Sequence, residues 1–214
     1  NFYSMADSII VGRLLGTNAL AAVGNTGPMT FLILGFISGL TSGFAVITAQ
    51  AFGSKNKEEL KRSIAMNIML NVGFGLIFTI LALATNKLLL ELINTPEEII
   101  NDSKLYLDII YGGLFATILY NATSCILRAV GNSKTPLYFL ILSSVLNVIL
   151  DIILIKYTNL GVAAAALATV ISQLISGILS IILILKKYPD LHVKKQHFSW
   201  CTSFASRHLK IGAP

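Results

Sequence analysis

Two aspartates stand inside apolar runs of this 214-residue sequence, where charged side chains are rare. Asp7 lies within the run SMADSIIV, and Asp151 lies within VLNVILDIILI. A charged side chain inside a membrane helix costs at least about 2.5 kcal/mol, so such a residue usually has a function and faces a cavity or a partner. Carboxylate oxygens are ligands for a hard cation such as Na⁺, and two nearby carboxylates also raise each other's affinity for a proton. The pair therefore predicts binding of a cation or a proton.

Further polar residues share helix faces with these aspartates. Residues three, four or seven positions apart lie on one side of a helix. This spacing relates three sets, which are Ser144, Asn147 and Asp151; Tyr3 and Asp7; and Thr169 and Gln173. With a rise of about 1.5 Å per residue, Asp7, Asp151 and Thr169 lie about 9, 7.5 and 13 Å below the outer helix ends. Three helices thus offer polar side chains at comparable depth, although Ser144, Thr169 and Gln173 could equally form hydrogen bonds between helices.

The composition indicates that most of the chain lies in lipid. Charged residues make up 12%, which gives 26 charges where a soluble chain of this length would have about 53. Apolar residues make up 55% and the mean hydropathy is +0.76, values typical of a chain built mostly from membrane helices. The low counts of Pro and Cys, 5 and 2, with 16 Gly, exclude collagen, disorder and a disulfide scaffold.

A membrane-spanning helix needs about 20 apolar residues, and five stretches meet this requirement. The predicted spans are 31–51, 64–85, 105–127, 137–155 and 161–185, and residues 1–11 look like the second half of a further span. We therefore expect an all-α integral membrane protein, with a six-helix transmembrane lobe over residues 1–185 whose first helix is truncated. Residues 186–208 are expected to form a cytoplasmic loop, and residues 209–214 to begin a seventh helix. The chain is thus expected to be part of a larger membrane protein.

The basic residues predict the orientation of these spans. Twelve of the 16 Lys and Arg fall on one side: Lys55, Lys57, Lys61, Arg62, Arg128, Lys134, Lys186, Lys187, Lys194, Lys195, Arg207 and Lys210. The other side has Arg13, Lys87, Lys104 and Lys156. Because the more basic side of a membrane protein is usually cytoplasmic, the first set is expected in the cytoplasm. The net charge of +6 then reflects topology, and no nucleic-acid partner is expected.

The loop after the third span has the pattern of a helix start. In Thr95-Pro96-Glu97-Glu98, Thr95 could accept hydrogen bonds from the first free amides, and Glu98 could reach back to the Thr95 amide. Proline suits the first helical position. The pattern predicts a capping box.

Enzyme and metal chemistry find little support. The sequence has no HExxH, GxSxG or phosphate-loop pattern and no histidine within a predicted span. His192, His197 and His208 lack the spacing of metal ligands, and Cys125 and Cys201 give no metal or disulfide framework. An aspartate pair like that of an intramembrane aspartic protease is conceivable, but the flanking pattern of those enzymes is missing. No catalytic residue and no cofactor is predicted, and Na⁺ or H⁺ at the aspartates is the only expected ion.

Four segments together resemble one transporter family. They are YSMADSIIVGRLLGTNALAAVG, ITAQAFGSKNKEEL, CILRAVGNSKTPLYFLILSSVLNVILDIILI and LGVAAAALATVISQ. In this order they are similar to the multidrug and toxic compound extrusion (MATE) family, and more to its DinF- and MepA-like bacterial branch than to its eukaryotic one. The resemblance covers nearly the whole chain.

The resemblance implies a fold and a site. Family members have two six-helix lobes and work by alternating access, and this chain looks like the amino-terminal lobe with the connecting loop. It implies a cation or proton site at Asp7, Asn147, Asp151 and Thr169, which are also the residues chosen by spacing. Tyr3 matches a nearby cavity tyrosine, and we expect Ser144 and Gln173 to line the substrate cavity with it.

The expected function is export of amphipathic or cationic organic compounds and drugs, by exchange for Na⁺ or H⁺. The expected partners are a small organic substrate and the lipid bilayer. The protein is expected in the plasma membrane, as a monomer together with a second lobe. A lipid-linked saccharide flippase of the same superfamily is the alternative, but it would need cationic side chains in the cavity, and no Lys or Arg lies in the middle of a span. An intramembrane hydrolase is a remote third reading.

Overall fold

The computed structural model describes residues 2–212, with side chains from Asp7 to Ile211, and its regular elements in this range are all helical. The eight long helices that precede residue 188 are α1 (Phe2–Leu14), α2 (Thr17–Asn25), α3 (Gly27–Gly53), α4 (Lys57–Leu92), α5 (Glu97–Gly112), α6 (Leu114–Ala129), α7 (Lys134–Tyr157) and α8 (Val162–Lys187). Two short 3₁₀ turns, η1 (Pro189–Leu191) and η2 (Lys195–His197), lead to α9 (Thr202–Gly212).

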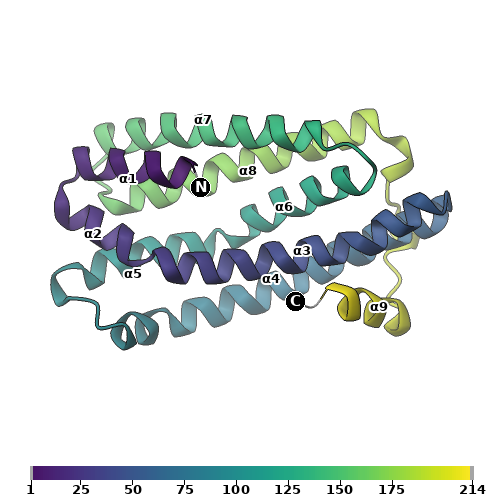
Figure 1. The fold of residues 1–214 in the computed structure, drawn as a ribbon, viewed down its shortest axis with the longest axis horizontal. Helices are drawn as coiled ribbons and strands as arrows, with labels where there is room; N and C mark the ends of the chain where they lie inside the picture. The colour runs from purple at the N-terminus through teal and green to yellow at the C-terminus, as the bar shows by residue number, and fades with distance from the viewer. Residues whose placement is uncertain (1, 213–214) are drawn as a thin grey trace.

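The helices lie side by side in an elongated bundle, and their connections gather at its two ends (Figure 1). The loops after α3, α6 and α8 lie at one end, on the right of Figure 1, and the loops after α1, α4 and α7 lie at the other. Within residues 2–212, four stretches are long and apolar enough to cross a membrane, namely 17–53, α4, α7 and α8, and the bent pair of α5 and α6 gives a fifth. The all-α membrane architecture expected from the sequence is confirmed.

The predicted span 105–127 is broken in the middle. α5 ends at Gly112 and α6 begins at Leu114, with a bend of 45° between them. A Cβ atom on Gly113 would lie 2.3 Å from Cγ2 of Val170 in α8, far inside ordinary carbon contact. The absence of a side chain at Gly113 therefore lets α8 approach the break closely.

The predicted capping box at Thr95 does not form. α5 begins at Glu97 with Pro96 before it, and no side chain caps its first amides. The Thr95 hydroxyl instead accepts a hydrogen bond of 2.8 Å from Nδ2 of Asn25, at the end of α2. A tertiary contact has replaced the local one, and it ties α2 to the loop between α4 and α5.

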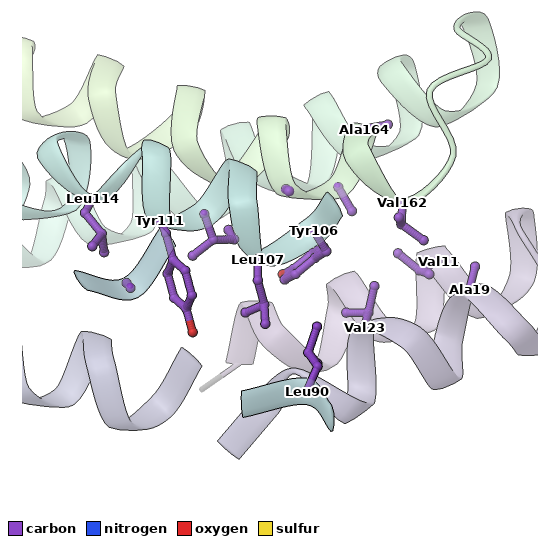
Figure 2. Packing of buried hydrophobic residues seen from close by; sticks show 14 of the residues in the cluster. Val11, Ala19, Val23, Leu90, Tyr106, Leu107, Tyr111, Leu114, Val162 and Ala164 are labelled. Carbon is purple, nitrogen blue, oxygen red and sulfur yellow. The ribbon is translucent and has the colours of Figure 1, made fainter. Parts of the chain in front are cut away.

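The core joins helices from across the bundle. Figure 2 shows Val11 of α1, Val23 of α2, Leu90 of α4, Leu107 of α5 and Ala164 of α8 in one cluster of buried apolar side chains. The outer surface is apolar as well, because large side chains such as Phe31, Leu76 and Tyr138 are at least 60% exposed. Such a surface suits lipid, which leaves the polar side chains to gather inside.

Candidate functional site

The two intramembrane aspartates meet inside the bundle. Asp7 of α1 is 6% exposed and Asp151 of α7 is fully buried. The two helices pack against each other, and the two carboxyl groups lie close enough to interact directly. The structure therefore places both acids at one buried point between α1 and α7.

The oxygen atoms around this point lack other donors. Oδ1 of Asp7, Oδ1 of Asn147 and both carboxylate oxygens of Asp151 are buried, and no donor in the described part of the chain bonds to them. The ion pairs found between residues 7 and 211 do not include either aspartate. A buried acceptor without a donor costs about 1–3 kcal/mol. A cation or a proton at this position would remove that cost for several oxygens together.

Asn147 and Thr169 complete the group. Nδ2 of Asn147 donates to Oγ1 of Thr169 across the contact of α7 with α8, at 3.2 Å. This bond occupies the amide nitrogen and leaves the carbonyl oxygen of Asn147 free of a donor. Asn147 lies one helical turn from Asp151 on α7, so their side chains share a face. The structure thus gathers all four residues of the predicted cation site.

A cavity of about 900 Å³ opens beside the aspartates. Its walls come from α1, α2, α3, α5, α6 and α8. Of the described residues that line it, Asp7 alone carries a charge, and Phe31, Tyr106 and Tyr120 contribute aromatic surface. Thr169 also lines this cavity, so the hydrogen-bonded pair of Asn147 and Thr169 adjoins it. The space is large enough for a drug-sized molecule.

The three residues predicted for the substrate cavity have different positions. Gln173 lines the large cavity, where its Oε1 accepts a 2.5 Å hydrogen bond from the Thr117 hydroxyl. Ser144 lines an adjoining pocket of about 20 Å³ between α6, α7 and α8, which shares Thr169 and Gln173 with the large cavity, and its hydroxyl donates to the Leu140 carbonyl at 2.9 Å. The side chain of Tyr3 lies outside the described residues.

Sequence reasoning missed the contribution of α5 and α6 to the cavity. Tyr106, Ile110, Thr117, Tyr120 and Asn121 all line it, on both sides of the helix break. Tyr106 and Ile110 are four residues apart and Thr117 and Tyr120 are three apart, so the sequence could have indicated a shared face within each half. Without the bend, however, the two halves could not be assigned to the same wall.

Comparison with known proteins identifies the family of the chain. The MatE family model matches residues 1–153. The probable multidrug resistance protein YoeA of Bacillus subtilis (strain 168) is 34% identical over 189 residues, which cover 86% of this chain and 41% of that protein. The DNA damage-inducible protein F of Escherichia coli (strain K12) is 28% identical over 190 residues, covering 85% of this chain and 40% of that protein.

Solved structures show the same arrangement. An inward-facing multidrug resistance MATE family transporter of the MOP superfamily superposes with a TM-score of 0.90 at 27% identity, over 98% of this chain and 48% of that one. The chain therefore spans about half the length of the relatives it matches, and corresponds to their amino-terminal lobe. Matched by the family model over most of its length, the chain belongs to the MATE family, whose members are multi-pass membrane transporters and not enzymes.

Proposed function

We propose that the full-length protein exports amphipathic or cationic organic compounds in exchange for Na⁺ or H⁺, by alternating access. One observation carries the proposal: buried oxygens of Asp7, Asn147 and Asp151 lie without donors, and Asp7 also lines a large cavity. The negative charge on these oxygens is not balanced by a described donor, and a coupling cation or proton would balance it. The multidrug names of the relatives support a drug-like substrate.

Asp7 would couple binding of the ion to binding of the substrate, because it belongs both to the aspartate pair and to the cavity wall. It lines the cavity and contacts Asp151. Binding of Na⁺ or H⁺ at the aspartates removes the negative charge that holds a cationic substrate near the aromatic walls. The two ligands then oppose each other's binding by the same free energy. Transport follows only if the ion binds one of the two access states more tightly than the other.

The proposed orientation of the protein in the membrane rests on its basic residues. The end of the bundle with Lys57, Lys134 and Lys187 faces the cytoplasm, in the plasma membrane. Residues 186–208 would connect two lobes, and residues 209–214 would continue into a seventh helix. Residues 209–212 form the second half of α9, which begins at Thr202. The lobe would work as a monomer together with its second half, which would complete the substrate path.

The alternatives receive no support from the cavity. A flippase for a lipid-linked pyrophosphate would need cations in its cavity, and the described lining residues include no Lys or Arg. A hydrolase would need a nucleophile and a base that converge on a substrate. The family match favours a transporter over a hydrolase.

The test uses the full-length protein in proteoliposomes with an imposed Na⁺ or pH gradient. Uptake of a fluorescent organic cation is expected to follow one of the two gradients, and Asp7→Asn or Asp151→Asn should remove that response. Asp108→Asn is the matched control, because Asp108 is paired with Lys104 and Asn86 away from the cavity. Gradient-driven uptake that survives in both variants would contradict the proposed roles.

A further inference from the structure

α9 is packed onto the bundle beneath α3 and α4, at the right of Figure 1. Ala205 is almost fully buried, and Phe204 and Leu209 contact an apolar cluster that includes Phe44 of α3 and Met66 of α4. A short helix after a loop of 3₁₀ turns is held here by side chains from two long helices. α9 therefore forms a packed tertiary contact with α3 and α4.

A buried histidine lies at the centre of this contact. His208 of α9 has no exposed surface. Its Nδ1 donates to the Phe204 carbonyl at 2.9 Å, because a carbonyl oxygen only accepts. Its Nε2 lies 3.3 Å from the Ser63 hydroxyl of α4, which lies 3.0 Å from the Thr48 hydroxyl of α3. With Nδ1 as the only protonated nitrogen, Nε2 accepts from Ser63, and three helices are joined by one chain of hydrogen bonds.

The charged groups around His208 come from two elements. On α9, Arg207 lies 3.7 Å from the carboxylate of Glu59 and donates to the Gln50 side chain at 3.0 Å, while Lys210 is exposed. On α4, the Arg62 guanidinium lies 5.6 Å from the Phe204 ring. The side chains of α3 at this contact, Thr48 and Gln50, are uncharged.

A second proton on His208 would disturb this contact. It would bury a positive charge near Arg207 and Arg62, and it would turn Nε2 from an acceptor into a donor facing Ser63. Burial lowers the pKa of His208 below its ordinary value, and the charge of Arg207 lowers it further, while the bonds to Phe204 and Ser63 act in the opposite direction. The docked helix thus prefers the neutral ring.

We propose that α9 is a pH-dependent latch, which is docked on α3 and α4 while His208 is neutral and released when His208 is protonated. α9 packs against α3, the helix that also forms part of the cavity wall. α3 lines the cavity as far as Ser38, and Thr48 lies ten residues further, or about 15 Å along the helix. Acid on the side of the membrane that α9 faces would therefore loosen one end of α3. The proposal is independent of the ion bound at Asp7 and Asp151.

The direction of the pH effect follows from linkage. Since docking lowers the proton affinity of His208, docking is strongest above the pKa of the free ring and weakens below it. Below about pH 6.5 the equilibrium shifts toward the released helix by about tenfold per pH unit, until the docked ring is itself protonated.

Hydrogen exchange of the full-length protein in nanodiscs tests the latch. After correction for the intrinsic rate, amides of residues 202–212 should exchange about tenfold faster near pH 5.5 than near pH 7.5. Residues 188–198, which contain His197, should show no such increase. His208→Leu should remove the pH dependence, because leucine fills the site without titrating. His192→Leu is the control, since His192 bonds to the Leu185 carbonyl and should leave the pH dependence of α9 unchanged.

A second variant keeps the test decisive if His208→Leu does not fold. Ser63→Ala removes the partner of Nε2 and should speed exchange of residues 202–212 at both pH values while preserving the increase in acid. Two results would overturn the proposal. One is exchange of α9 in the unmodified protein that does not change with pH, and the other is the same pH dependence in His208→Leu.

Discussion

Replacing Gly113 by alanine should destabilise the protein through one steric contact. The added Cβ would lie 2.3 Å from Cγ2 and 2.7 Å from Cγ1 of Val170. Carbon atoms in contact are about 3.5–4.0 Å apart, so α8 or the helix break must move by about 1.2 Å. Overpacking of this kind costs about 1–3 kcal/mol. The backbone itself is not the obstacle, because φ is −87° at Gly113, a value that alanine adopts readily.

The neighbouring glycine provides the control. A Cβ on Gly112 would meet nothing within 4 Å, so Gly112→Ala should leave the free energy of unfolding unchanged or raise it by up to about 1 kcal/mol through helix propensity. The assay is thermal unfolding of the purified full-length protein in detergent. Adding Val170→Ala to Gly113→Ala should recover part of the loss, since the two positions are in contact. Equal stability of the two glycine variants would refute the argument that this contact sets the position of α8.

Three further outcomes are expected. Asp7→Asn combined with Asp151→Asn should impair ion-driven uptake no more than either single change, because both act at one site; a larger combined loss would show two separate sites. Gly75→Ala should cost less than about 1 kcal/mol in thermal unfolding, although its Cβ meets the Ile118 side chain, because only the flexible end of that side chain must move. Asn86→Ala should lower the free energy of unfolding by about 1–3 kcal/mol, since its fully buried amide donates to a carboxylate and a carbonyl of α5.

The helical architecture and the grouping of the aspartates could be predicted from the sequence. The cost of a charge in lipid leaves few orientations for Asp7 and Asp151, and helical spacing puts Asn147 on the face of Asp151. The structure accordingly brings these three residues and Thr169 together. Physical constraints that act on single residues were sufficient here.

Features that depend on distant contacts were not predictable. Gly112 and Gly113 sit in an apolar run that satisfies the requirements of a span, and the break becomes necessary only when Val170 is placed against it. The cap at Thr95 fails because Asn25, far away in the chain, takes its hydroxyl. His208 in a polar segment gives no sign of burial until Ser63 is seen beside it. In each case the deciding partner is present in the sequence, but only the fold brings it into contact.

Asp7 both lines the cavity and belongs to the aspartate pair, and this determines how the membrane potential acts on the exchange. Suppose that the same carboxylate binds a monovalent ion on its way into the cell and a monovalent organic cation on its way out. The lobe then has the same net charge during the inward and the outward transition. The membrane potential then does no work on the exchange. If the substrate is neutral, the inward movement of the ion transfers net charge. The membrane potential then contributes about 2.3 kcal/mol per 100 mV to each transport cycle. The charge of the cargo would thus decide whether the cell's voltage contributes to its export.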